Sequence, residues 1–213
     1  MSFDYLAYAV PADLIESLNK QPEAFLNIFY EANYAEEFSE VQEELGDDVD
    51  KIGANTAKKI YECVQELLEN ESQTLDLDGE YWASPAHFFL TCEFDEEEVL
   101  AQPPFTIKQE NGRILVNALG GTDSINTEQN MVLITPPDQV KEIAKVLPEL
   151  LKEDFKKRWN DLSKQSGQYV DAFEDPQDLD EFIADLREFM HEVLIPFYQS
   201  ASDKNMGIIV MLN

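Results

Sequence analysis

The chain ends in GIIVML, a continuous apolar run at residues 207–212. A short apolar run of this kind is typical of a buried β-strand. At the other end, residues 3–10 (FDYLAYAV) form a short, β-prone run, which predicts a second strand. We expect these first and last strands to lie in one sheet, with helices packed on it.

Apolar residues recur at helical spacing in several segments between these two runs. Helices are predicted after Pro11 and after Pro22, since proline suits the first position of a helix, and a third stripe spans 58–68. No internal repeat is visible in the chain.

The C-terminal third carries the clearest helix signals. Thr135 is predicted to cap a helix that Pro148 should kink or divide, and the same start signal recurs at Asp175. The apolar stripe over 179–197 is too wide for a surface helix, so we expect that helix to be central.

The strands and helices do not alternate regularly. Residues 105–117 predict a β-hairpin with its turn at Asn111-Gly112, and MVLI (131–134) predicts a short strand. Runs of helices between scattered strands favour the α+β class. We therefore predict one domain over 1–213, with a mixed or antiparallel sheet that includes both terminal strands and several amphipathic helices.

The formal net charge is −29, from 15 basic and 44 acidic residues. Residues 1–100 contain 25 acids and 4 bases, and the remainder contains 19 acids and 11 bases. Binding to nucleic acids depends on Lys and Arg, and anionic membranes repel negative charge, so neither partner is expected. A basic partner, a cation or simple solubility remains.

The negative charge is concentrated in one segment. Glu36 to Asp50 holds eight acids and no base. This segment is predicted to be either a solvated helix ending at Gly46 or a mobile acidic insert, and the insert as a whole is placed near 31–58. The docking surface that we predict for a basic protein consists of Glu36, Glu37, Glu40, Glu43, Glu44, Asp47 and Asp48.

The cysteines and the N-terminal residues bear on the compartment. Cys63 and Cys92 are the two cysteines, with no CxxC pattern, and free thiols suit a reducing compartment. The first residues lack the basic region of a signal peptide, and no apolar run approaches the ~20 residues that span a bilayer. A cytoplasmic location is expected.

The segment DLDGEYWASPAHFFLT (76–91) is the most chemically suggestive part of the sequence. His87 is the candidate general base, because imidazole titrates near neutral pH. Tyr81, Trp82 and Asp78 are candidate binding residues beside it. The alternative is a turn leading into a core-forming helix, with His87 partly buried.

Metal and cofactor patterns fail on their spacing. An EF-hand aligned on Gly79 would place Thr74 and Pro85 at positions that need carboxylates. A di-iron site needs two Glu-x-x-His pairs, and the chain has one, Glu188 with His191, because Ser84 stands three residues before the other histidine. Gly120-Gly121 lacks the lysine of a phosphate loop. No metal or cofactor is predicted.

Nucleophilic catalysis and anion binding also lack support. No G-x-S-x-G elbow is present, and Cys92 is expected to be a small buried residue. FKKRW (155–159) is the one basic cluster, and we interpret it as a solvated helix face that balances nearby acids.

Several of these stretches resemble one known family. ALGG (118–121), ITPPDQVKEIAKVL (134–147), the segment around Trp82 and His87, and the closing GIIVML resemble the YfbM-like family of bacterial proteins, a family of unknown function. The acidic stretch 31–58 is expanded relative to that pattern. The resemblance implies an α+β cytosolic domain and no established reaction.

Two functional hypotheses follow. The first is an immunity- or inhibitor-like interaction module whose acidic N-terminal half docks a basic protein, because opposite potentials speed encounter and select partners. The second is a small-molecule-binding protein or hydrolase with a pocket near Trp82 and His87. Solubility alone would also explain the charge.

Overall fold

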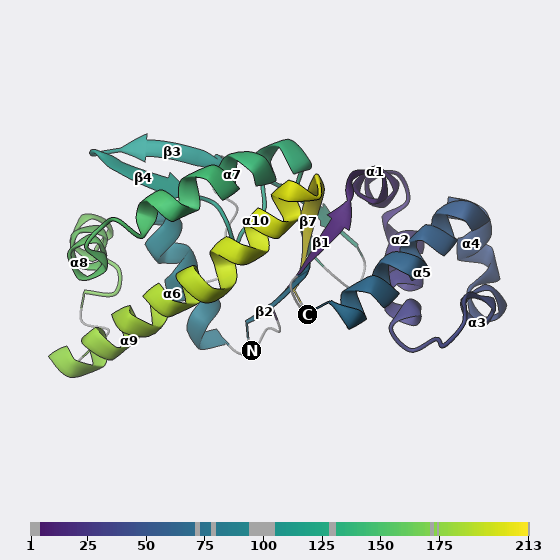
Figure 1. The fold of residues 1–213 in the computed structure, drawn as a ribbon, viewed down its shortest axis with the longest axis horizontal. Coiled ribbons are helices and arrows are strands. Elements are labelled where there is room, and N and C mark those ends of the chain that lie inside the picture. Colours follow the sequence, from purple (N-terminus) through teal and green to yellow (C-terminus); the bar gives the residue numbers. More distant parts are fainter. Residues whose placement is uncertain are drawn as a thin grey trace.

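The computed structural model describes residues 5–70, 73–77, 80–93, 105–127, 131–170, 173 and 175–212. The main sheet has five strands, every neighbouring pair is antiparallel, and both terminal strands belong to it (Figure 1). The fold is therefore α+β, as predicted. The strand order is β2 (Thr74–Leu77), β1 (Tyr5–Pro11), β7 (Met206–Leu212), β6 (Met131–Thr135) and β5 (Asp123–Asn126).

The two terminal strands pair along their whole length. Tyr5 lies opposite Leu212, and Pro11 lies opposite Met206. Successive side chains of a strand point to opposite faces, so a strand that is apolar throughout must be covered on both. Ile208 and Ile209 belong to different core clusters, which confirms that the closing apolar run is buried on both faces.

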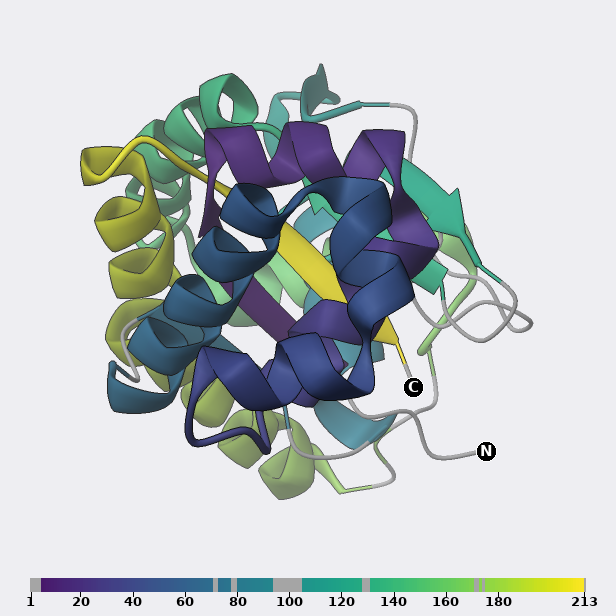
Figure 2. The same ribbon diagram turned by 90° about the vertical axis from the view of Figure 1, so that its right-hand side faces the viewer.

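One face of the sheet is covered by the N-terminal helices. Their apolar sides pack with Val10, Val132 and Ile209 of the sheet into one core cluster. Figure 2 looks onto this layer, with β7 in yellow behind it. The helices are α1 (Ala12–Lys20), α2 (Pro22–Ala32), α3 (Phe38–Glu44), α4 (Gly46–Ile52) and α5 (Ala54–Glu69).

The other face is covered by the remaining elements, which share a second core cluster with Tyr5 and Val210. In Figure 1 they lie on the opposite side of the sheet from α1–α5. They are α6 (Glu80–Thr91), the hairpin of β3 (Ile107–Glu110) and β4 (Arg113–Val116), α7 (Pro137–Leu150), α8 (Phe155–Ser166), α9 (Pro176–Glu188), a π-helical segment (Phe189–Leu194) and α10 (Ile195–Asp203).

Several details differ from the sequence predictions. Thr135 is the last residue of β6 and does not cap α7, which begins after Pro136. Pro148 lies inside α7 without dividing it. The stripe over 179–197 is central only in its second half, because Leu186 is the one buried residue of α9, whereas α10 is well buried.

Candidate functional site

The acidic segment forms two short helices with the acids on the solvent side. The sequence predicted one helix ending at Gly46 as one of two alternatives. The structure has two helices instead: α3 ends at Glu44, and α4 begins at Gly46. Val41 and Val49 are buried against the N-terminal core and hold the two helices to it. Exposed acids are Glu36, Glu37, Glu40, Glu43, Glu44 and Asp47, and these are named the acidic face below.

Asp48, the seventh predicted docking residue, differs from the other six. Its side chain is only 13% exposed, accepts a hydrogen bond from Asn27 and pairs with Lys51. These contacts lower the pKa of its carboxyl, with the bond from Lys51 as the largest cause. Asp48 therefore connects α4 to α2 and supports the acidic face.

The connection before α3 is held by helix α5. The Tyr61 hydroxyl donates a 2.7 Å hydrogen bond to the Glu36 carbonyl oxygen, and the Gln65 amide donates one of 2.7 Å to Ala32. The rings of Phe38 and Tyr61 lie 5.9 Å apart. The start of the acidic face is thus fixed to the helix beside it.

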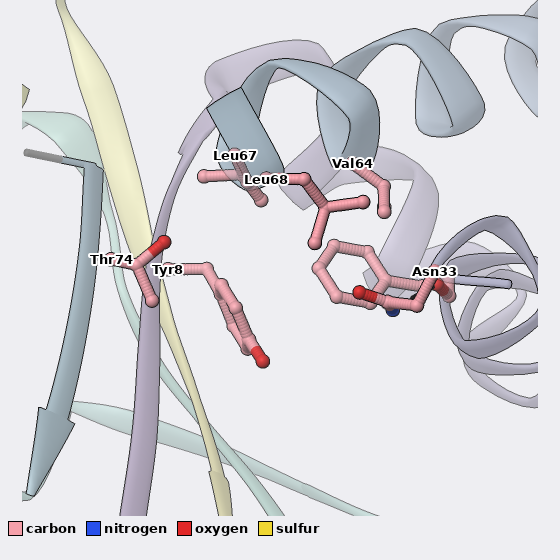
Figure 3. Close-up of a pocket in the computed structure, with 7 residues that line it drawn as sticks. Tyr8, Asn33, Val64, Leu67, Leu68 and Thr74 are labelled. Atoms are coloured by element: carbon pink, nitrogen blue, oxygen red, sulfur yellow. Dashed lines mark hydrogen bonds between the residues drawn. The ribbon is translucent and has the colours of Figure 1, made fainter. Parts of the chain in front are cut away.

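A pocket of about 480 Å³ opens between the sheet and helices α2 and α5. Figure 3 shows Tyr8 and Thr74 on the strands at one side of the pocket, with Val64, Leu67 and Leu68 on α5 above. Tyr8 and Thr74 lie opposite each other in the β1–β2 register. The full lining is Tyr8, Phe29, Asn33, Val64, Leu67, Leu68 and Thr74, and this site is named the Tyr8 pocket below.

The Tyr8 pocket has apolar walls and a small polar component. The rings of Tyr8 and Phe29 meet edge to face at 5.2 Å. Asn33 donates from its amide to the Phe29 carbonyl oxygen at 2.9 Å, which fixes its side chain at the rim. Leu68 is 58% exposed and Tyr34, next to Asn33 in the chain, is 85% exposed. Leu68 thus presents an apolar side chain to solvent in the lining of this pocket.

The residues for which a pocket was predicted from the sequence lie in a different part of the fold. His87 is on α6, is 2% exposed, and its carbonyl oxygen accepts a hydrogen bond from Thr91. Tyr81 and Trp82 belong to α6, of which only the backbone is described at these positions, and Asp78 lies outside the described residues. His87 and the acidic face are on opposite sides of the sheet. The proposed pocket near Trp82 and His87 stays a prediction.

The basic cluster FKKRW is not a solvated face throughout, because Arg158 is 2% exposed. Its guanidinium donates hydrogen bonds to the carbonyl oxygens of Phe89 and Ile114 and to the Glu153 carboxylate. Burial is the main reason that its pKa is lowered. A cleft of about 350 Å³ beside it is also lined by Arg113, which pairs with Asp161 at 2.6 Å. Both arginines of this cleft are therefore paired with its own acids.

The ALGG segment is a buried loop. Tyr198 donates a hydrogen bond to the Ala118 carbonyl oxygen at 2.6 Å, and Tyr5 donates one to Leu119 at 3.0 Å. The Asn117 side chain accepts from the Gly120 amide and donates to the Gly121 carbonyl oxygen. Burial raises the pKa of both tyrosines well above the usual value. These groups satisfy the buried backbone polar groups of the loop.

Neither cysteine has the surroundings of a nucleophile. Burial, with Glu66 and Asp13 nearby, raises the pKa of Cys63 to about 12. Burial also raises the pKa of the half-buried Cys92. Within the described ranges, no group of three or more His, Cys, Asp or Glu side chains is placed to hold a metal ion. Among those same residues, no helix has the length and apolar character needed to cross a bilayer.

The Tyr8 pocket was not found by sequence reasoning. Its residues come from β1, α2, α5 and β2, so their spacing in the chain carries no signal. Leu68 gave a weak sequence signal for the pocket, because it is a large apolar residue next to the buried stripe of α5 that includes Val64 and Leu67 but is not itself buried.

The comparisons with known proteins give a family and no function. No curated protein and no solved structure matches the chain. The model of one protein family, the domain of unknown function DUF1877, matches residues 1–211. The chain therefore belongs to the DUF1877 family.

Proposed function

We propose that this protein is an interaction module that docks a basic protein partner on the acidic face of α3 and α4. The observation that carries the proposal is that these acids are exposed on, or directly before, two helices that buried valines hold to the core. Residues 31–50 contain nine acids and no base. Lys51, the next cation in the chain, is paired with Asp48 at 2.7 Å.

Ion pairs occur on both sides of the sheet, and on the N-terminal side they include Lys58 with Glu62 and Lys59 with Asp13. On the other side of the sheet, Arg113 pairs with Asp161, Arg158 with Glu153, and Lys152 with Glu149. Among the described residues, no Lys or Arg forms an ion pair with the six acids of the acidic face. A surface of one sign raises the rate of encounter with an oppositely charged protein and disfavours partners of like charge.

The finer assignments belong to this proposal. They are an immunity- or inhibitor-like role, in which the chain covers a cationic protein, and a place among the YfbM-like proteins of the bacterial cytoplasm. The resemblance of the segments around ALGG (118–121) and 134–147 supports the second.

The test is affinity capture from the source cell's lysate at ~0.15 M salt with three baits. The first is the wild-type chain. The second, the six-acid variant, has the acidic face neutralised by E36Q, E37Q, E40Q, E43Q, E44Q and D47N. The third, the matched control, loses the same charge from exposed acids across the sheet by E142Q, D178N, E181Q, D185N, E188Q and E192Q.

We expect one basic protein to be retained by the wild type and the matched control and to be lost from the six-acid variant. If both variants lose it equally, total charge matters and the acidic face does not. If all three columns are empty, the proposal is contradicted, and the acids serve solubility.

A further inference from the structure

The Tyr8 pocket and the acidic face belong to the same helical layer. The pocket is built from α2, α5 and the edge of the sheet, and the acidic face follows α2 directly in the chain. Tyr61 of α5 donates to the Glu36 carbonyl oxygen, and Val64, one turn further along α5, lines the pocket. A partner that covers the acidic face therefore lies next to the pocket.

The pocket's chemistry suits a mostly apolar group. Phe29, Val64, Leu67 and Leu68 provide aliphatic and aromatic walls, with the hydroxyl and amide groups of the other lining residues between them. A concave site with apolar walls and a few polar groups is the usual form of a binding pocket, and about 480 Å³ lies within the common range of volume.

Leu68 in the lining, and Tyr34 beside Asn33 in the chain, supply a second observation. Tyr34 at 85% exposure and Leu68 at 58% are two of the most exposed large apolar side chains among the described residues. Tyr34 follows Asn33 of the pocket rim, and Leu68 is part of the lining. Interface centres are enriched in tyrosine and are apolar, with charged groups around them.

Charges beside the pocket select the kind of occupant. Glu31, Glu36 and Glu69 stand on the segments that form or flank it. The cations at the start of α5 are paired with acids of this chain, Lys59 with Asp13 at 2.5 Å and Lys58 with Glu62 at 3.4 Å. The potential around the pocket therefore favours a cationic neighbour over an anionic one.

We propose that the Tyr8 pocket receives an aromatic or large aliphatic side chain that the basic partner presents next to lysine or arginine residues. This inference rests on the proposed function and adds to it a specific anchor. The acidic face attracts and orients the partner, and the pocket buries the anchor, which supplies most of the specificity for a particular sequence. Buried anchors of this type dominate interface energies.

The test uses defined peptides and one substitution, L68E, which adds negative charge and removes apolar surface. These two changes have opposite effects on the binding of a basic peptide. The probes are a lysine-flanked peptide with a central tryptophan, the same peptide with alanine there, and the tryptophan peptide flanked by glutamate. L68E makes the rim more acidic and less apolar. If charge alone drives binding, L68E should strengthen the binding of a basic peptide. If binding depends on the pocket, L68E should weaken it. V193E is the matched control, because Val193 is 42% exposed and lies across the sheet.

Dissociation constants are measured by titration at ~0.15 M salt, and methyl resonances of Val64, Leu67 and Leu68 are followed by NMR. We expect the tryptophan peptide to bind about tenfold more tightly than the alanine peptide, with shifts at these methyl groups. L68E should remove that gain, and V193E should keep it. Equal binding of the two lysine peptides, or stronger binding by L68E, would overturn the inference.

The same titrations separate this inference from the proposed function. If the lysine–alanine peptide binds and the six-acid variant loses it, while tryptophan adds nothing, the acidic face stands and the anchor pocket falls. If the glutamate-flanked peptide binds as well as the lysine-flanked one, the pocket takes apolar groups regardless of charge. Charge then plays no part in choosing the occupant, and the basic anchor is overturned.

Discussion

Asn27 on α2 donates a 2.8 Å hydrogen bond to the carboxylate of Asp48 on α4. The other oxygen of the same carboxylate accepts from Lys51 at 2.7 Å. One acid of a strongly acidic surface is thus used to hold that surface in place. Together with the buried Val49, this contact sets the orientation of α4 and with it the position of part of the acidic face.

Asp48 should make stability depend on pH in a defined direction. Its folded pKa is lowered by Lys51 and Asn27, so its contribution is present above the unfolded value near ~3.9 and is lost as the pH falls through the folded pKa. We expect D48A to cost about 1–2 kcal/mol at pH 7 and less below ~pH 4. Urea unfolding at several pH values measures both.

D50N is the control for this series, because Asp50 is exposed on the same helix. It should change stability by less than about 0.5 kcal/mol. A D48A cost that stays constant down to pH 2 would show that the lowered pKa is not the source of the effect.

Arg158 should be among the residues least tolerant of substitution. R158M leaves the carbonyl oxygens of Phe89 and Ile114 without this donor and removes the partner of Glu153, and we expect a cost of about 3–5 kcal/mol. R187M is the comparison, since Arg187 is exposed and donates to the Leu151 carbonyl oxygen. It should cost under about 1 kcal/mol by thermal unfolding. Equal costs would contradict the buried network.

Two glycines with positive φ allow the cost of backbone strain to be measured apart from the cost of a steric clash. Gly112 (φ 76°) and Gly121 (φ 66°) both occupy the left-handed region. A Cβ at Gly112 meets nothing within 4 Å, but at Gly121 it would lie 2.8 Å from Leu133 Cβ and 2.9 Å from Ile134 N. G112A should cost about 1 kcal/mol and G121A about 2–5 kcal/mol in denaturant unfolding. Equal losses would show that the loop relaxes.

The thiols should react slowly and in a fixed order. With a pKa of about 12, Cys63 is almost entirely protonated at pH 8, and the thiolate is the reactive form. Cys92 is half-buried, so alkylation by iodoacetamide in the native state should reach it first. Mass spectrometry of the modified peptides gives the order. Modification of Cys63 first would mean that the N-terminal core opens readily.

The net charge should make the protein more stable at higher salt. Self-repulsion at −29 is screened by ions, so Tm is expected to rise from low salt to ~0.5 M NaCl. The six-acid variant should show a smaller rise than the wild type. A flat or falling Tm would mean that the acids are already paired or hold specific cations.

Local rules predicted much of the fold. The Asn111-Gly112 turn was predicted from its residues, and both adopt positive φ, at 51° and 76°, in the hairpin of β3 and β4. The start of α9 was also predicted, and the Asp175 side chain accepts from the Gln177 amide there. The terminal strands were recognised because a continuous apolar run has few alternatives to burial.

Other features depend on contacts between distant residues. Strands β2 and β5 are short and partly polar, and they form strands by pairing with β1 and β6. The wide stripe of α9 was interpreted as central, but Leu186 is the one buried residue of that helix, and Phe182 is only partly buried where it packs on Trp159 at 4.8 Å. The sequence could not place the carbonyl oxygens that hold Arg158 or the helices that close over Tyr8.

The most direct test of an acidic docking face is the salt dependence of association with the captured basic protein. Stopped-flow kinetics should show the association rate constant falling at least about tenfold between ~0.02 M and ~0.5 M salt, with little change in dissociation. The six-acid variant should flatten that dependence, and the matched control should keep most of it. An association rate that ignores salt, or that responds equally in both variants, would contradict docking on α3 and α4.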